Sequence, residues 1–363
     1  MRAAVFYGKG DIRIEAVADP VALPGELLLE VHAVGICGTD AHEFSAGPHM
    51  FPIHAQNEVT GHVGPMIPGH EITGRIVDIG TGVDGFEVGA VVASGAGIWC
   101  GECRSCVAGR TNLCQRYSTV GLSRNGGLAQ YCSVPAFTCL AIEQYDISED
   151  TAGLGQPMAI GVHAMSRGLL SAGDHAAVVG AGGIGAFLTY AASRQGASVG
   201  VVDLDVDRLK IASQLGAQFT HPAAEGPPAE AFADHGLSPT VVYEVSGHPA
   251  GLATALELVQ PGGRLVLVGI HEGNLNVSAR ELTISEIDVV GTQAHVCSVD
   301  LPKALELLGA RDMPWNDVAP VALPLDRLVS DGIAPMVEGV SQHIKTLIDP
   351  WSDSIRNTEM EVS

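Results

Sequence analysis

The segment AAVVGAGGIG at residues 176–185 decides the fold, because a short apolar run passes directly into the pattern G-x-G-x-x-G. A helical pattern of apolar residues (Phe187, Leu188, Ala191 and Ala192) follows at once. Glycines between a strand and a helix permit a tight turn and a close approach to a pyrophosphate, which the helix N-terminus attracts. A simple turn is the competing interpretation, but the flanks favour a dinucleotide site. The predicted contacts are Gly180, Gly182, Gly183, Ile184 and Gly185.

An acidic residue is expected at the end of the next strand of such a unit. Asp203 ends the next apolar run, 18 residues after Gly185, and its carboxylate would accept hydrogen bonds from the adenosine ribose. Its competing interpretation is a solvated loop acid. Further aspartates rather than an arginine follow closely, so we expect NAD rather than NADP. Leu204 and Arg208 complete the predicted cofactor contacts.

Short apolar runs alternate with helical patterns from about residue 165 to residue 295. Such alternation predicts a parallel sheet with helices on both faces, which is a doubly wound Rossmann sheet. The overall fold class is therefore α/β. The predicted strands are residues 176–179, 198–202, 240–244, 264–268 and 288–291.

The remainder of the chain has a different pattern. Residues 1 to about 155 are rich in glycine and β-branched residues, and the runs at 27–34, 72–79 and 89–94 predict an all-β domain. A helix is expected at 301–308, followed by short strands and helices to Asp349. We place the domains at 1–158, 159–297 and 298–350, the last returning to the first domain. Residues 351–363 are acidic and polar and predict a poorly ordered tail.

Composition narrows the function classes. The 363 residues are 46% hydrophobic, and 41 acidic against 19 basic residues give a net charge of −22. A field of that sign repels phosphate backbones, so we expect no nucleic-acid partner. No apolar run approaches the roughly 20 residues of a membrane span, and the N-terminus becomes charged too early for a signal peptide. We expect a cytoplasmic protein with no membrane partner.

Four of the eight cysteines follow the spacing C-x2-C-x2-C-x7-C. Four thiolates this close in sequence complete a tetrahedral zinc shell, which leaves no position for substrate and so predicts a structural site. An iron–sulfur cluster and an empty, reduced loop are the alternatives. Cys132, Cys139 and Cys297 are interpreted as small core residues. The predicted structural zinc ligands are Cys100, Cys103, Cys106 and Cys114.

A second group of metal-binding residue types is spread along the first domain. Cys37 lies in GICGTDAH at 35–42, and His70 and Glu71 lie in PGHEITG at 68–74. A thiolate, an imidazole and a carboxylate suit zinc, and three protein ligands leave a position open for a substrate. Each residue alone is more typical of a core or a surface, so the combination carries the prediction.

With these motifs in order, the chain resembles the medium-chain zinc alcohol dehydrogenase family. Residues 69–83 match the family's zinc signature, G-H-E-x2-G-x5-G-x2-V, at every defined position. VTG at 59–61, GGLAQY at 126–131 and GVHA at 161–164 are similar to the butanediol, sorbitol and threonine dehydrogenase branch. The resemblance implies a GroES-like β-rich catalytic domain beside the Rossmann domain. It also implies two Zn²⁺ per chain, NAD, and a secondary alcohol, such as a diol or polyol, as substrate.

The resemblance implies a role for each residue of the second group. Cys37 and His70 would bind the catalytic zinc, and Glu71 would bind it or stand just behind it. Asp40 would orient His70. One departure is Gln156, which stands where this branch usually has a glutamate that is a direct or water-mediated partner of the zinc. Gln156 keeps an oxygen ligand but removes a negative charge, and we include it as a predicted ligand.

The implied reaction is a hydride transfer between an alcohol, or its ketone, and NAD. Zinc would lower the pKa of the alcohol, Thr39 would hydrogen-bond its hydroxyl, and His42 would pass the proton to solvent. The site is expected at the carboxyl ends of the Rossmann strands, in the cleft between the domains.

Two alternatives stay open from the sequence. One is an amino-alcohol or threonine-type 3-dehydrogenase. The other is a non-catalytic NAD-binding scaffold, for which Gln156 is the only support. By family analogy we expect a homodimer or homotetramer, with residues 265–292 at the contact.

Overall fold

The computed structural model describes residues 1–271 and 277–360 and divides the chain into two compact units. One unit comprises Met1–Ala159 and His295–Ser363, so it is built from two separate stretches of sequence. The other is the continuous stretch Ile160–Ala294. No helix in the described part of the chain is both long and apolar enough to cross a membrane.

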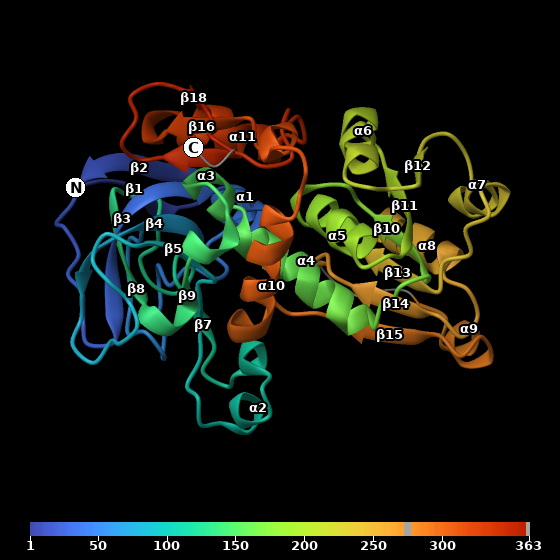
Figure 1. Ribbon diagram of the computed structural model, residues 1–363, viewed down its shortest axis with the longest axis horizontal. Coiled ribbons are helices and arrows are strands. Elements are labelled where there is room, and N and C mark those ends of the chain that lie inside the picture. The colour runs from blue at the N-terminus through green and yellow to red at the C-terminus, as the bar shows by residue number, and fades with distance from the viewer. Residues whose placement is uncertain (272–276, 361–363) are drawn as a thin grey trace. The chain divides into compact units, whose positions relative to one another are not determined.

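The sheet of the continuous unit is parallel throughout, which confirms the predicted Rossmann fold (Figure 1). Its strand order is β12-β11-β10-β13-β14-β15, so the direction of winding reverses between β10 and β13. The sequence did not predict β12, whose four residues FTHP lack an apolar run. The strands are β10 (His175–Val179), β11 (Ser198–Asp203), β12 (Phe219–Pro222), β13 (Val241–Glu244), β14 (Arg264–Leu267) and β15 (Asp288–Gly291).

Helices cover both faces of this sheet. Helices α5 and α6 contact each other and strands β10 to β12, whereas α7 and α8 contact each other, and α8 packs on β10 and β13. Alternate residues such as Ala177, Val179 and Val242 point from the strands into a core shared with Leu252 and Leu258 of α8. The helices are α5 (Gly183–Arg194), α6 (Val206–Gln214), α7 (Pro228–Asp234), α8 (Pro249–Leu258) and α9 (Ala279–Ile284).

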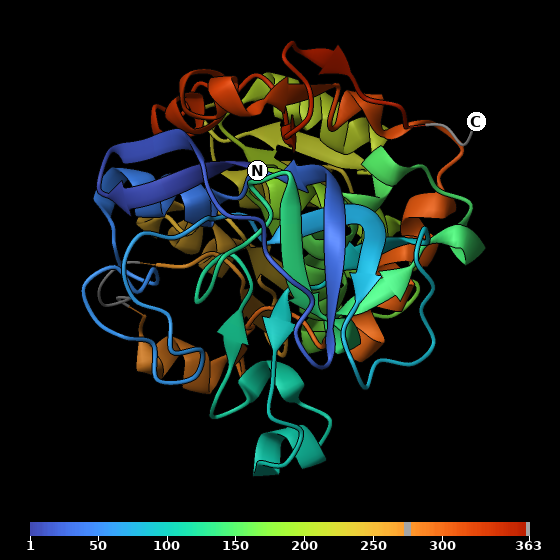
Figure 2. The same ribbon diagram turned by 90° about the vertical axis from the view of Figure 1, so that its left-hand side faces the viewer.

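The other unit is rich in strands (Figure 2). Its main sheet has the order β18-β16-β17-β3-β4-β5-β9, with β8 paired to β3. Strands β1 and β2 form a separate hairpin, and β6 pairs with β7. The strands are β1 (Arg2–Gly8), β2 (Asp11–Ala16), β3 (Glu26–Gly35), β4 (Glu71–Ile79), β5 (Val91–Ser94), β6 (Gly97–Ile98), β7 (Ser118–Thr119), β8 (Tyr131–Pro135), β9 (Cys139–Ala141), β16 (Val321–Pro324), β17 (Leu347–Asp349) and β18 (Arg356–Asn357).

The prediction that the first 155 residues are all-β is wrong at α1 (Gly38–Ala46). At the start of this helix the Asp40 carboxylate accepts a hydrogen bond from the Cys37 backbone N–H at 2.9 Å. A side chain in the first turn thus provides a partner for a backbone N–H at the helix N-terminus. The other helices that belong wholly or partly to this unit are α2 (Arg104–Val107), α3 (Glu149–Ala152), α4 (Gly155–Gly168), α10 (Cys297–Gly309) and α11 (Ala334–Val337). Shorter turns are η1 (Thr111–Leu113), η2 (Ala136–Thr138), η3 (Glu143–Tyr145), η4 (Trp315–Asp317), η5 (Leu325–Arg327) and the π-helical η6 (Leu328–Ile333).

The prediction of a poorly ordered tail is wrong for residues 351–360. Strand β18 pairs with β16, and Trp351 donates a hydrogen bond from Nε1 to the Val31 carbonyl at 3.0 Å. Arg356 binds both oxygens of Asp150, at 2.7 and 2.9 Å. Burial alone would raise the pKa of Asp150, but Arg356 and His32 hold it well below its usual range. The prediction rested on the polar composition of the tail, but the polar groups of Trp351 and Arg356 are hydrogen-bonded to Val31 and Asp150. Residues 361–363 lie outside the described residues.

Candidate metal centres and cofactor site

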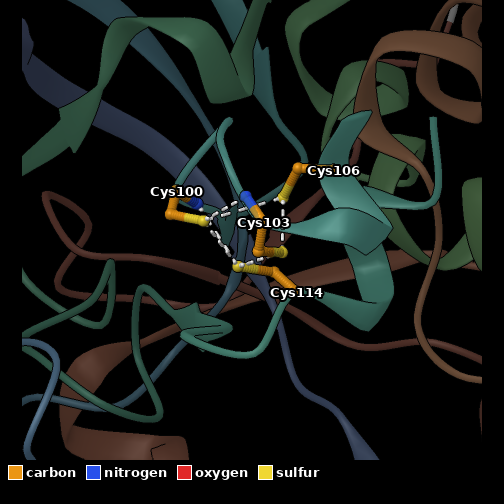
Figure 3. Close-up of side chains that lie close together, drawn as sticks. All are labelled: Cys100, Cys103, Cys106 and Cys114. Carbon is orange, nitrogen blue, oxygen red and sulfur yellow. Dashed lines mark hydrogen bonds between the residues drawn. The ribbon is translucent and has the colours of Figure 1, made fainter. Parts of the chain in front are cut away.

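The four clustered cysteines lie in the loop between β6 and β7, which projects from the sheet around α2 (Figure 2). Their side chains point toward a common centre (Figure 3). Sulfur–sulfur distances are 3.5 Å for Cys100–Cys114 and Cys103–Cys106, and 4.0 Å for Cys100–Cys106 and Cys103–Cys114. Zinc–sulfur bonds of about 2.3 Å place tetrahedral sulfurs about 3.8 Å apart. The four residues therefore fit one zinc ion in a closed shell.

Backbone amides support negative charge on these sulfurs. The N–H groups of Cys103 and Arg116 donate to the sulfurs of Cys100 and Cys114, at 3.4 and 3.3 Å. Such donors, from Glu102 and Cys103, lower the pKa of Cys100 to about 6. Burial and the neighbouring thiols raise the pKa of Cys106 to about 12. One cation that held all four sulfurs as thiolates would remove this difference between Cys100 and Cys106.

The second cluster is assembled by strand pairing across the sheet. Gly35 at the end of β3 pairs with Glu71 at the start of β4. This register brings Cys37, just beyond β3, beside His70 and Glu71, and their ligand atoms all lie within 4.8 Å of one another. His70 and Glu71 are buried, and Cys37 is half-buried. A thiolate, an imidazole and a carboxylate at this spacing fit a zinc ion with a position left open.

Asp40 stands beside the imidazole of this cluster. Its Oδ1 lies 3.9 Å from His70 Nδ1, while its Oδ2 accepts the Cys37 N–H. Neither Oδ1 nor His70 Nδ1 has a closer hydrogen-bond partner among the described residues. Burial raises the pKa of Asp40. Burial lowers the pKa of His70, but Cys37 and the two carboxylates outweigh it and raise that pKa to about 9. This concentration of negative charge favours a cation.

Lys345 is part of this site, and the sequence did not predict it. Its Nζ donates to Glu71 Oε1 at 2.6 Å and to the Ile36 carbonyl at 2.9 Å, and lies 2.5 Å from Glu71 Oε2. The Lys345 side chain is only 5% exposed. Lys345 is separated from Glu71 by most of the chain, and the polar segment SQHIKT at 341–346 in which it lies gives no signal of this pairing. Lys345 thus fixes Glu71 through its Oε1, whereas Glu71 Oε2 is buried without a hydrogen-bond partner among the described residues.

The other predicted catalytic residues lie on nearby elements of the same unit. Thr39 Oγ1 is 3.8 Å from Cys37 Sγ. His42 follows one turn later on α1, is exposed, and stacks on His49 with ring centroids 4.8 Å apart. Gln156 is buried in the first turn of α4. Thr39 therefore lies beside the Cys37 sulfur and His42 lies at the solvent, as a path for a proton from the site to solvent requires. Gln156 remains a predicted ligand.

The glycine turn after β10 has the geometry of a phosphate cradle. Gly180 has φ +104°, and a Cβ there would lie 3.0 Å from the Ser246 backbone nitrogen. A Cβ on Gly185 would overlap the Gly180 carbonyl. Gly182 is half-buried immediately before α5, where Gly183 and Ile184 begin the helix, and a Cβ there would make only an ordinary contact with one side chain. These residues fit a pyrophosphate at the N-terminus of α5.

Asp203 lies beside this turn, at the end of β11. Its Oδ2 accepts the Ala181 N–H at 2.6 Å and its Oδ1 accepts the Asp205 N–H at 2.8 Å. Leu204 is 80% exposed, and Arg208 Nη1 would lie 3.8 Å from a Cβ on Gly182. The structure thus brings all the predicted cofactor residues to the carboxyl ends of β10 and β11.

The fold and both clusters agree with comparisons to known proteins. Residues 23–144 match the family model of the alcohol dehydrogenase GroES-like domain, and residues 183–310 match that of the zinc-binding dehydrogenases. Sorbitol dehydrogenase of Bacillus subtilis (strain 168) is 33% identical over 317 residues, which are 85% of this chain and 86% of that protein. The chain belongs to the zinc-binding alcohol dehydrogenase family. Another similar member of that family is the (R,R)-butanediol dehydrogenase of the same strain, at 29% identity over 96% of this chain and all of the relative.

Other members agree with this placement. L-threonine 3-dehydrogenase of Shewanella loihica (strain ATCC BAA-1088 / PV-4) is 33% identical over 73% of this chain and 76% of that protein. The crystal structure of 2R,3R-butanediol dehydrogenase from Bacillus subtilis has a TM-score of 0.87 at 28% identity, with 96% of this chain and 99% of that chain covered. The predicted family, branch and fold are confirmed. The protein is an oxidoreductase that acts on the CH–OH group of a small molecule, with zinc and a nicotinamide dinucleotide as cofactors. A non-catalytic scaffold is not favoured.

Proposed function

We propose that this dehydrogenase oxidises a secondary hydroxyl of a diol or polyol to the ketone, with NAD as hydride acceptor. The observation that carries the proposal is the cluster of Cys37, His70 and Glu71 with the Thr39 hydroxyl beside the thiolate. The names of similar family members support the substrate class, since they include butanediol and sorbitol dehydrogenases.

Each residue of the cluster would either bind the zinc, orient a ligand or balance a charge. Cys37 and His70 would bind the zinc, and Asp40, 3.9 Å from His70 Nδ1, would fix the orientation of the imidazole. Lys345 would hold Glu71 behind the metal and balance its charge. When bound, zinc supplies a Lewis acid for the substrate oxygen, and NAD accepts the hydride.

Thr39 and His42 would carry the proton that the alcohol loses. The Thr39 hydroxyl can accept a hydrogen bond from the substrate and donate one onward, because a hydroxyl does both. His42 is exposed on the same helix, and histidine is the side chain best suited to exchange protons near neutral pH. Substrate at the half-buried thiolate would therefore connect to solvent within one turn of α1.

Asp203 would set the preference for NAD over NADP. Its carboxylate lies at the glycine turn, and Asp205 and Asp207 follow it. These negative charges would repel a 2′-phosphate, and the nearest arginine, Arg208, directs its Nε toward Asp205 at 3.6 Å. A ribose 2′-hydroxyl would instead donate to Asp203.

The protein would act as a homodimer or homotetramer in a reducing compartment such as the cytoplasm. Strand β15 is an edge of its sheet, with Val289 42% exposed, and a second copy could pair along it. Residues 272–276 of the predicted contact segment 265–292 lie outside the described residues. Cysteines without disulfide bonds at both clusters suit a reducing compartment.

A panel of alcohols tests the proposal. Purified protein is given NAD or NADP with butane-2,3-diol stereoisomers, sorbitol, L-threonine or ethanol, and the absorbance of reduced nicotinamide is followed. We expect the highest kcat/KM for a vicinal diol or sugar alcohol with NAD, with the Cys37→Ser protein as the inactive control. L-threonine as the best substrate, or no alcohol oxidation by protein that binds two zinc ions, would contradict the proposal.

A further inference from the structure

We propose that His271 positions the nicotinamide half of the dinucleotide and that Glu244 fixes the orientation of its ring. This inference rests on the dinucleotide site and extends it across the sheet. Both residues belong to the Rossmann unit, and neither is used in the site described above.

Glu244 and His271 form a buried pair at the end of two adjacent strands. Glu244 ends β13, and His271 lies four residues beyond the end of β14, which pairs with β13. His271 Nε2 is 2.6 Å from Glu244 Oε2, and the side chains are 6% and 0% exposed. A Cβ on Gly269 would lie 2.8 Å from the same carboxylate oxygen, so the chain after β14 packs tightly over Glu244.

The place of this pair in the sheet assigns it to one half of the cofactor. In a doubly wound sheet the dinucleotide lies across the carboxyl ends of the strands, with its adenosine half beyond the first two strands and its other half across the switch point. Asp203 marks the adenosine side, at the end of β11. Ser246, two residues after Glu244, lies against Gly180 of the glycine turn. The ends of β13 and β14 are therefore on the nicotinamide side.

One nitrogen of the His271 ring is left to bind a ligand. Nδ1 is buried and has no hydrogen-bond partner among residues 1–271 and 277–360, although buried nitrogens of this kind are normally paired. Glu244 also accepts hydrogen bonds from the Ser246 and Gly247 N–H groups and the Ser246 hydroxyl. These three donors hold the carboxylate in place against the His271 ring.

The carboxylate decides which ring nitrogen carries the proton. A carboxylate only accepts, so Nε2 is the donor of the pair and Nδ1 of a neutral ring is an acceptor. The nicotinamide half offers donors that match: the carboxamide NH₂ and the ribose hydroxyls. ADP lacks both the nicotinamide ring and the ribose that carries it, so it serves as a probe of the other half alone.

The test compares the dissociation constants of NADH and ADP, measured by calorimetry on the zinc-loaded protein without alcohol. In His271→Ala we expect NADH to bind roughly three- to tenfold more weakly, the value of one hydrogen bond, and ADP to bind unchanged. His235→Ala, an exposed histidine at the end of α7 in the same unit, is the matched control and should change neither constant.

A second variant, Glu244→Gln, leaves His271 in place but changes its partner. The amide oxygen can still accept from Ser246 and Gly247, whereas the amide NH₂ would donate to Nε2 and force the proton onto Nδ1. We expect the same selective weakening of NADH in this variant. An acetylpyridine analogue of NADH, which lacks the carboxamide NH₂, identifies the donor: if His271→Ala weakens its binding as well, the donor is a ribose hydroxyl, and otherwise it is the carboxamide.

Unchanged NADH binding in His271→Ala would overturn the inference. Equal weakening of NADH and ADP would also overturn it, because the pair would then only hold the loop. Failure of the wild-type protein to bind ADP at all is a different result, which would contradict the dinucleotide site itself.

Discussion

The two metal clusters of the β-rich unit are built in opposite ways. One short loop provides four sulfurs, those of Cys100, Cys103, Cys106 and Cys114, and its own amides donate hydrogen bonds to two of them. Cys37 and His70 come from separate strand ends that only the pairing of β3 with β4 brings together. The first arrangement closes a shell around a zinc ion, whereas the second leaves room for a substrate.

Charge balance separates the clusters further. The cysteine loop has no carboxylate among its ligands, whereas Cys37 and His70 lie beside Glu71 and Asp40, which are 0% and 2% exposed. Lys345 supplies a buried positive charge against Glu71. The comparison teaches that a structural site can be specified locally, whereas the catalytic site depends on partners from distant parts of the chain.

The largest effect is expected from Cys37→Ser. Loss of the thiolate should remove the catalytic zinc and lower kcat/KM by about 10³-fold or more, since metal activation contributes several kcal/mol. NADH binding and the zinc of the cysteine loop should persist, which steady-state kinetics, calorimetry and metal analysis will show. Cys132→Ala, a buried cysteine outside both clusters, is the matched control. Near-wild-type turnover in Cys37→Ser would contradict the assignment.

Cys103→Ser tests the four-cysteine cluster. It should leave one zinc per chain and destabilise the unit by several kcal/mol, because binding of a structural zinc contributes folding free energy. Protein that remains folded should keep kcat within a few-fold of wild type, because this loop holds no substrate. A loss of turnover as large as that in Cys37→Ser, in protein that still contains the catalytic zinc, would show that the two clusters are not separate in function.

Lys345→Met tests the long-range ion pair. Removing one partner of a buried pair typically costs about 3–5 kcal/mol of unfolding free energy, because the other charge is left uncompensated. Urea denaturation of the single variant and of the double variant with Glu71→Gln measures the coupling. The double variant should recover most of the loss. Additive losses would mean that Lys345 does not stabilise the protein through Glu71.

The smallest effect is expected from His42→Ala, since His42 is exposed and binds no metal in this account. Alcohol oxidation should slow mainly at low pH, because at higher pH hydroxide and buffer accept the proton without a relay. The pH profile of kcat for wild type and variant gives the result. A loss that is the same at every pH would argue against the relay.

Local patterns allowed the sequence to predict the glycine turn, the cysteine loop and most strands of the parallel sheet. The resemblance to the family implied that Cys37 and His70 act together, although they lie on different elements. Features decided by distant partners were not predictable from pattern alone. Lys345 pairs with Glu71 across most of the chain, and the tail after Trp351 is ordered by Val31 and Asp150. Likewise, the pair of Glu244 and His271 forms only because β13 and β14 are neighbours.

The central claim is that Cys37 and His70 bind a second, catalytic zinc ion. Anomalous diffraction from crystals, collected on both sides of the zinc absorption edge, tests it directly, because it locates zinc without assuming which residues bind it. The account predicts two peaks per chain, one among the four cysteine sulfurs and one between Cys37 and His70. A peak at the cysteine loop alone, in protein that oxidises alcohols, would contradict it.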